Sequence, residues 1–155
     1  MQKPYVVGID IGGTNTVFGI VDARGSVLAT SSIKTQKHVF LEDYIKELYQ
    51  ELSKLIKDNT DISKIKGIGI GAPNANYFTG NIEQAPNLPW KGIIPFAKKI
   101  NEKFDLPVAI TNDANAAAIG EMIYGAARGM KDFIMITLGT GVGSGIVSNG
   151  SLVYG

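Results

Sequence analysis

The run DIGGTN, from Asp10 to Asn15, combines residue types that could bind phosphate. Gly12 and Gly13 would allow a turn with positive φ and bring backbone amides close to a ligand. Thr14 and Asn15 add short polar donors, and successive turn amides form an anion-binding concavity. Asp10 is placed to organise a hydrated Mg²⁺. The alternative is a simple hairpin turn, since Gly-Gly is a common hairpin signal.

A second glycine-rich run, LGTGVGSG, ends at Gly145. Its other glycines are Gly139, Gly141 and Gly143, so the glycines alternate strictly. This spacing differs from G-x-G-x-x-G, and the chain also lacks the P-loop pattern G-x-x-x-x-G-K-[ST]. Thr140 is available as a donor in a wide turn that is nearly free of side chains. The run is interpreted as a second phosphate loop, and a glycine-rich hairpin without a ligand is the alternative.

The third candidate site is NDANAAA, which begins at Asn112. A carboxylate at the end of a strand, directly before an alanine-rich helix, occupies the usual ligand position of open α/β sheets. Asp113 could accept the proton of a hydroxyl that attacks a phosphoryl group, and Asn112 could orient the acceptor. The alternative is that Asp113 only caps the helix. A cap needs one polar residue, whereas Asn112, Asp113 and Asn115 crowd the same place.

The elements that would position these residues follow from the spacing of apolar side chains. Helices are expected at 42–58, from 95, and at 114–124, and strands at 5–9, 16–21, 27–33, 64–73, 107–111, 133–138 and 142–147. The polar segment 74–88 is expected to be a functional loop. This order predicts an α/β fold with a mixed sheet, in which three antiparallel strands precede helix-linked parallel strands. The last strand pair is interpreted as the start of another unit.

The composition excludes several classes of function. The 155 residues are 45% hydrophobic and 19% charged, as in a globular protein. The net charge of +1 and the presence of only Arg24 and Arg128 as arginines give no reason to expect nucleic acid or a membrane surface as a partner. There is no cysteine, which excludes disulfides, a thiolate nucleophile and a Cys-ligated metal within the chain. The single histidine, His38, is expected at the surface, and Trp90 in the core.

No run approaches the roughly 18 apolar residues of a membrane helix, and the N-terminus has no sustained apolar segment of a secretory signal. A cytoplasmic location is therefore expected.

Five blocks of the sequence resemble the ROK family of sugar kinases, most closely its glucokinases, within the actin-like superfamily of hexokinase and Hsp70. In chain order the blocks are GIDIGGTN, GIGIGAPN, APNLPWKG, TNDANAAAIGE and ITLGTGVGSGI, and they span essentially the whole chain. Five blocks in the family's order are far more specific than any one of them alone.

The resemblance implies an actin-like (ribonuclease H-like) ATPase lobe at residues 1–128 and the first hairpin of a second lobe at 129–155. It assigns the two glycine-rich runs, Asp10–Asn15 and Gly139–Gly143, to the two loops that bind the phosphates of ATP. A Mg²⁺ ion, held through water by Asp10, is expected with the nucleotide.

For the sugar, the resemblance assigns Asp113 as the catalytic base that accepts the proton of the attacking hydroxyl. Asn112 matches a ligand of a sugar hydroxyl. Gly71, Pro73 and Asn87 match the wall of the sugar pocket. The implied activity is that of an ATP-dependent hexose kinase, with glucose favoured and mannose, fructose and N-acetylated hexosamines left open. A sugar-binding ROK regulator without catalysis is the alternative.

Family members are about twice as long as this chain. The resemblance places the Glu and His that hold the sugar, the structural zinc motif and the adenosine pocket beyond residue 155, so the chain alone is expected to have little or no kinase activity. No helix-turn-helix is expected before the first phosphate loop. A homo-oligomer is expected, and the apolar hairpin at 133–147 is expected to pack against another copy or to be poorly ordered.

Overall fold

The structure is a computed structural model that describes residues 4–139 and 141–154. The strands are β1 Tyr5–Ile11, β2 Asn15–Asp22, β3 Val27–Lys34, β4 Ile65–Ala72, β5 Ile82–Glu83, β6 Ile93–Ile94, β7 Val108–Asn112, β8 Phe133–Leu138, β9 Val142–Ser148 and β10 Ser151–Leu152. The helices are α1 Leu41–Asn59, α2 Phe96–Phe104 and α3 Asp113–Tyr124, with short 3₁₀ turns η1 Thr35–Lys37 and η2 Ile62–Lys64. This is the mixed α/β class that the sequence predicts.

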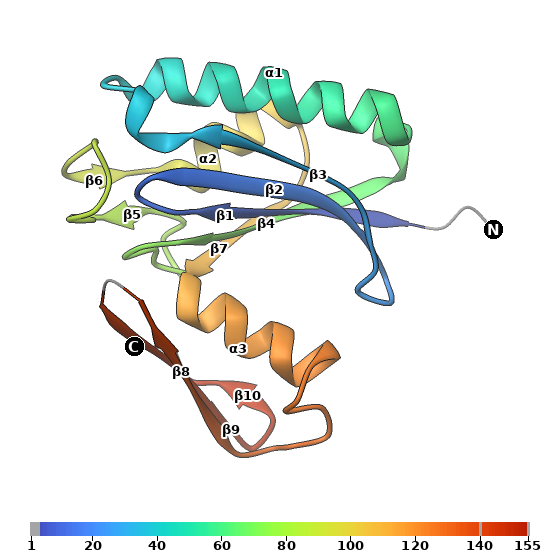
Figure 1. Ribbon diagram of the computed structural model, residues 1–155, viewed down its shortest axis with the longest axis vertical. Helices are drawn as coiled ribbons and strands as arrows, with labels where there is room; N and C mark the ends of the chain where they lie inside the picture. The colour runs from blue at the N-terminus through green and yellow to red at the C-terminus, as the bar shows by residue number, and fades with distance from the viewer. Residues whose placement is uncertain (1–3, 140, 155) are drawn as a thin grey trace.

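The large sheet has five strands in the order β3-β2-β1-β4-β7. The first three strands form the expected antiparallel meander, and β4 and β7 then add in parallel to β1. Figure 1 shows α1 and α2 on one face of this sheet and α3 on the other, next to a smaller sheet of order β10-β9-β8. The helix-linked parallel part therefore brings the carboxyl ends of β1, β4 and β7 to one edge.

The main core lies between the large sheet and α1. The buried residues of α1 recur at helical spacing: Tyr44, Ile45, Leu48, Leu52 and Ile56. Glu42 and Asp43 in the first turn and Lys57 in the last turn suit the helix dipole. Trp90 is in this core, as expected, with 6% exposure and its ring 4.5 Å from that of Tyr44.

The segment 74–88, expected to be a functional loop, contributes one strand to a short β-ribbon. Ile82 pairs with Ile94 and Glu83 with Ile93, which joins β5 to β6. Asn74, directly after the GAP turn, has a left-handed backbone with φ of 52°, which asparagine tolerates better than most residues. Its carbonyl accepts a hydrogen bond from the amide of Glu83 at 3.0 Å. The segment is therefore folded back on itself.

The hairpin β8-β9 has a partner within the chain. Its inner face packs on α3, and β10 pairs with β9. The hairpin, which was expected to pack against another copy or to be poorly ordered, therefore packs on a surface of α3 that no local pattern indicated. The outer face remains apolar and exposed, with Leu138 at 81% exposure. Pairing with another copy and the division at residue 128 stay predictions.

The expectation for His38 is also wrong. His38 is 7% exposed and lies between η1 and α1, although the residues before it, Thr35 to Lys37, are polar. Within the described residues, no helix is both long and apolar enough to cross a membrane.

Candidate functional site

The first glycine-rich loop is a tight connection between β1 and β2. The amide of Gly12 donates to the carbonyl of Asn15 at 2.9 Å. The expected positive φ at Gly12 and Gly13 is wrong, because neither has one. Glycine is needed for space instead: a Cβ on Gly12 would lie 2.9 Å from the Asn15 carbonyl oxygen, and one on Gly13 would lie 2.7 Å from that of Asn87.

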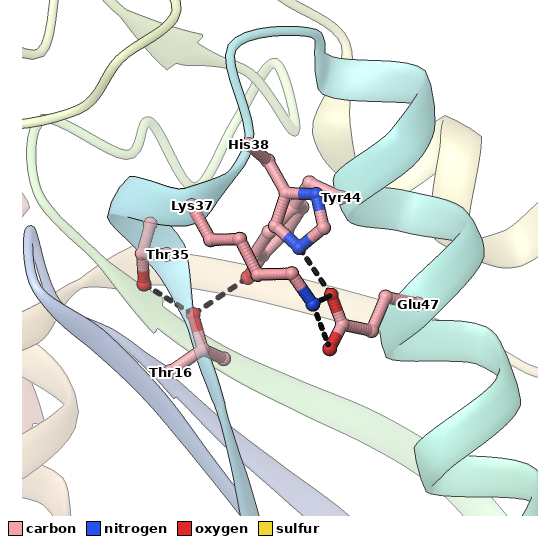
Figure 2. Close-up of polar contacts among 6 residues, drawn as sticks. All are labelled: Thr16, Thr35, Lys37, His38, Tyr44 and Glu47. Atoms are coloured by element: carbon pink, nitrogen blue, oxygen red, sulfur yellow. Dashed lines mark hydrogen bonds and ion pairs between the residues drawn. The ribbon is translucent and has the colours of Figure 1, made fainter.

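A buried hydroxyl network supports this loop from behind (Figure 2). The Thr16 hydroxyl lies 2.9 Å from that of Thr35 and 2.8 Å from that of Tyr44, and all three residues are buried. The amide of Thr35 donates to the carbonyl of Thr14 at 2.9 Å. Burial raises the pKa of the Tyr44 hydroxyl far above its ordinary value, against a smaller lowering by Thr16, so this group stays neutral. The loop is thereby tied to α1.

Next to this network, Figure 2 shows Glu47 of α1 contacting two residues of the preceding turn. The Lys37 ammonium lies 3.2 Å from the Glu47 carboxylate, and His38 Nε2 contacts the same carboxylate. The His38 ring meets that of Tyr44 edge to face at 5.8 Å. These contacts bury His38, and they hold the start of α1 against the segment that follows β3.

The candidate catalytic base Asp113 and the candidate Mg²⁺ ligand Asp10 converge at the ends of the parallel strands. Asp10 and Asp113 line one cavity of about 380 Å³, together with Gly71 and Thr137. Burial raises the pKa of Asp10 above its ordinary value, and the negative charge of Asp113 raises it further. Gly71 lies between them, since a Cβ there would lie 3.6 Å from the Asp113 Cα and 4.0 Å from Asp10 Oδ1.

This pair suits a divalent cation, because two carboxylates in one cavity are stabilised by positive charge and Mg²⁺ prefers oxygen ligands. In the described part of the chain, no three His, Asp or Glu side chains gather as a metal site. Water and nucleotide oxygens would have to complete the coordination of an ion held here.

The start of α3 shows how the two predicted polar residues share the same place. Asn112 is the N-cap, and its side-chain oxygen accepts from the amide of Ala114 at 3.0 Å. Asp113 is the first helical residue, and its Oδ1 lies 2.8 Å from the same amide. The capping role considered for Asp113 therefore falls mainly to Asn112.

Asn112 lines a second, larger cavity of about 610 Å³ next to the first. Its polar residues include Asn115, which sequence reasoning grouped with Asn112, and several that it did not single out: Asn74, Asn76, Glu83, Thr111 and Ser144. A run of amides and a carboxylate in one hollow can recognise many hydroxyl groups. Only their density in the segment 74–83 could have indicated them beforehand.

The other predicted sugar-wall residues lie nearby. Pro73 is half-buried directly after β4. Asn87 is exposed, and its backbone oxygen packs against Gly13 of the first loop. The APNLPW block therefore contacts the first phosphate loop through the main chain.

The second glycine-rich turn differs from the first. At Gly139 and Gly141 an added Cβ would meet nothing within 4 Å. At Gly143 it would lie 3.1 Å from the Ala114 Cβ, and at Gly145 2.5 Å from the Ala118 Cβ. The last two glycines thus allow β9 to pack closely on α3. Thr140, the predicted donor in this turn, lies outside the described residues.

Glu121 makes a structural contact at the end of α3. Its carboxylate accepts from the amide of Ala126 at 2.7 Å and thereby closes the end of α3.

The mixed sheet, the two glycine-rich turns and the carboxylates between them define an actin-like ATPase fold. Among solved structures, a ROK glucokinase from Streptomyces griseus in complex with glucose and AMPPNP superposes with a TM-score of 0.82 at 36% identity, over 97% of this chain and 46% of that one. A ROK hexokinase from Thermus thermophilus superposes with a TM-score of 0.82 at 30% identity, over 97% of this chain and 49% of that one.

The chain belongs to the ROK family, whose model matches residues 6–155. It is 38% identical to a glucokinase of Halalkalibacterium halodurans, over 100% of this chain and 47% of that protein. It is also 32% identical to a xylose repressor of Caldicellulosiruptor bescii, over 97% of this chain and 38% of that protein. The chain thus spans about half the length of the curated glucokinase it matches.

Proposed function

We propose that this chain provides the first phosphate loop, the catalytic base and part of the sugar pocket of an ATP-dependent hexose kinase. The observation that supports this most directly is the convergence of Asp10 and Asp113 in one cavity, beside the polar cavity that Asn112 lines. Carboxylates serve as proton acceptors and as ligands of hydrated Mg²⁺ in phosphoryl transfer to a hydroxyl.

In the proposed reaction, a sugar hydroxyl attacks the γ-phosphorus of ATP. The new bond from the sugar oxygen forms as the bond to the β,γ-bridging oxygen breaks, and ADP leaves. Asp113 accepts the hydroxyl proton, and Asn112 orients the sugar. Asp10 would hold Mg²⁺ through water, and the ion would neutralise charge on the phosphates.

The two glycine-rich turns would bind the phosphates. The first loop is Asp10 to Asn15, which the Thr16 network holds in shape. The second loop, Gly139 to Gly143, would contribute backbone amides and Thr140. The relatives' greater length supports placing the adenine pocket, the structural zinc and further sugar ligands outside this chain.

Glucose is the favoured sugar, because the Streptomyces griseus relative is a glucokinase whose structure holds glucose and an ATP analogue. A second candidate function is sugar binding without catalysis in a regulator. The similarity to the xylose repressor favours it. Asp113 favours the kinase, since a sensor needs no proton acceptor.

The test is the substitution Asp113→Asn in the full-length protein, with coupled assays of glucose phosphorylation by MgATP. We expect kcat to fall about 10²–10⁴-fold while glucose binding, measured by calorimetry, is retained. The exposed Asp58 of α1 provides a matched control, because Asp58→Asn removes one carboxylate far from the cavity. Unchanged turnover in Asp113→Asn, or no turnover in the wild type, would contradict the proposal.

The 155-residue chain by itself is expected to show little or no turnover in the same assay. Turnover at ordinary kinase rates by the chain alone would contradict the assignment of the adenine pocket to a missing lobe. The expected homo-oligomer and cytoplasmic location stay predictions; light scattering on the full-length protein tests the first.

A further inference from the structure

Three aromatic rings from distant parts of the chain gather at the rim of the polar cavity. Tyr77 stacks on Tyr154 with ring centres 4.4 Å apart and an angle of 17°. Phe78 meets each of them edge to face, with ring centres 5.5 Å apart in both cases. Tyr77 and Phe78 follow β4, whereas Tyr154 follows β10. We call Tyr77, Phe78 and Tyr154 the aromatic cluster.

The cluster is at the surface. Tyr77 is 47% exposed and Phe78 is 74% exposed. Packing within the described residues therefore does not account for Phe78, because burying a phenyl ring is favourable and these residues leave the ring exposed. An aromatic ring that remains exposed beside a polar hollow is available to stack on a ligand.

All three rings line the same cavity of about 610 Å³ as Asn112, Asn115 and Glu83. One wall thus offers amide and carboxylate groups, and another offers aromatic faces. Sugar rings need both, since their hydroxyls form hydrogen bonds while their C–H faces are apolar and stack on aromatic rings.

The position of the cluster relative to Asp113 fixes which part of a ligand it would meet. The reacting hydroxyl must lie near Asp113, which lines the neighbouring cavity with Asp10. Asn112 directly precedes Asp113 in the chain and would hold the same sugar. The aromatic rings form another part of the wall of the larger cavity. They would therefore contact a group attached to that sugar.

We propose that the aromatic cluster is a stacking platform for a second ring joined to the hexose that the protein binds. The ligands that fit it are disaccharides and aryl glycosides, in which the anomeric carbon bears the second ring and the other hydroxyls stay free. This inference rests on the proposed sugar site. Burial, and second the charge of Tyr77, raise the pKa of Tyr154, so its hydroxyl also stays protonated as a donor to sugar oxygens.

The experiment is calorimetric titration of the full-length protein with glucose, with phenyl β-D-glucoside and with cellobiose. We expect phenyl β-D-glucoside to bind about tenfold more tightly than glucose, as one good aromatic contact provides. Phe78→Ala and Tyr77→Ala should each remove most of that difference and leave the affinity for glucose within about twofold. Phe78→Tyr keeps an aromatic ring and should therefore keep the tighter binding of phenyl β-D-glucoside.

Phe40→Ala is the matched control, because Phe40 is equally exposed at 67% but precedes α1, away from this cavity. It should change none of the affinities. Circular dichroism of each variant confirms that it is folded, and Phe78→Tyr covers the case in which an alanine variant is not.

Two outcomes overturn the inference: equal or weaker binding of both two-ring ligands than of glucose, or a preference for them that survives Phe78→Ala and Tyr77→Ala. A parallel kinase assay with glucose separates this result from the proposed function. Ring-dependent selectivity without turnover supports the platform and contradicts the kinase. Glucose turnover without selectivity contradicts the platform alone.

Discussion

The two glycine-rich turns have similar sequences but use their glycines for opposite reasons. In the first loop, an added Cβ would lie within 3 Å of a backbone oxygen at both Gly12 and Gly13. At the tip of the second, Gly139 and Gly141 face open space. The first loop is therefore fixed by the packing around it, whereas the described tip of the second is free to meet a ligand without moving a neighbour.

The comparison teaches that a glycine-rich motif does not by itself report backbone conformation. None of Gly12, Gly13 and Gly139 has a positive φ. In the first loop, glycine allows the backbone to approach Asn87 closely. In the second, Gly139 and Gly141 leave the surface of the turn open. Substitutions that add only a methyl group distinguish the two.

The largest effect is expected for Gly13→Ala. Its methyl group would lie 2.7 Å from the backbone oxygen of Asn87, which cannot move aside as a flexible side chain could. We expect a loss of about 1–3 kcal/mol in the free energy of unfolding, measured by urea denaturation followed by circular dichroism.

Gly139→Ala is the control for Gly13→Ala, because it makes the same chemical change in open space. It should leave stability unchanged or raise it by up to about 1 kcal/mol through the unfolded state. Equal destabilisation by both substitutions would remove the distinction between the two turns.

A smaller loss in the free energy of unfolding is expected for Thr16→Val, which tests whether the hydroxyl network holds the first loop. Valine keeps the shape but leaves the buried hydroxyls of Thr35 and Tyr44 without the partner at 2.9 and 2.8 Å. We expect a loss of about 1–2 kcal/mol by the same denaturation assay. Thr30→Val, at an exposed position of β3, should cost much less. If the two variants are equally stable, the network does not support the loop.

The smallest effect concerns the charge of Asp10 beside the first loop. Because the folded state raises the pKa of Asp10 above its ordinary value of 3.8, the folded protein binds this proton more tightly than the unfolded chain. Stability should therefore fall as pH rises from about 3.8 through the folded pKa. Asp10→Asn should remove that slope and stabilise the fold slightly at pH 7, by less than about 1 kcal/mol because Asp10 is only partly buried.

Asp61→Asn should behave in the opposite way. Hydrogen bonds from Ser63 lower the pKa of Asp61, so its charge stabilises the fold above pH 3.8, and this contribution is lost as pH falls through the folded pKa. Urea denaturation between pH 3 and 7 measures both variants. The same pH dependence in both would contradict the assigned shifts.

Local patterns were sufficient for most of the fold. The apolar spacing in α1 and the β-branched runs of the meander predicted those elements, since each depends on one exposed and one buried face. The alternation of β9 and the alanines of α3 were also visible, but their meeting was not. Gly145 and Ala118 are distant in the chain, and only the fold shows that each is small because of the other.

The positions of the candidate residues were predictable where they lie on strand ends and unpredictable where they depend on tertiary contacts. Asp10 and Asp113 follow from strand and helix boundaries alone. His38 was misplaced, because its burial depends on Glu47 from the next helix. The aromatic cluster could not be foreseen either, as Tyr77 and Tyr154 meet only through the packing of the small sheet.

Trp90 gives the molecule a built-in optical probe. It is the chain's single tryptophan, and it is packed against Tyr44 in the core beneath α1. Its emission therefore reports the large sheet and its helices, and it is insensitive to the β8-β10 sheet on the far side of α3. Comparing the fluorescence of Trp90 with the far-ultraviolet dichroism of the whole chain shows whether the two sheets unfold in one transition or in succession.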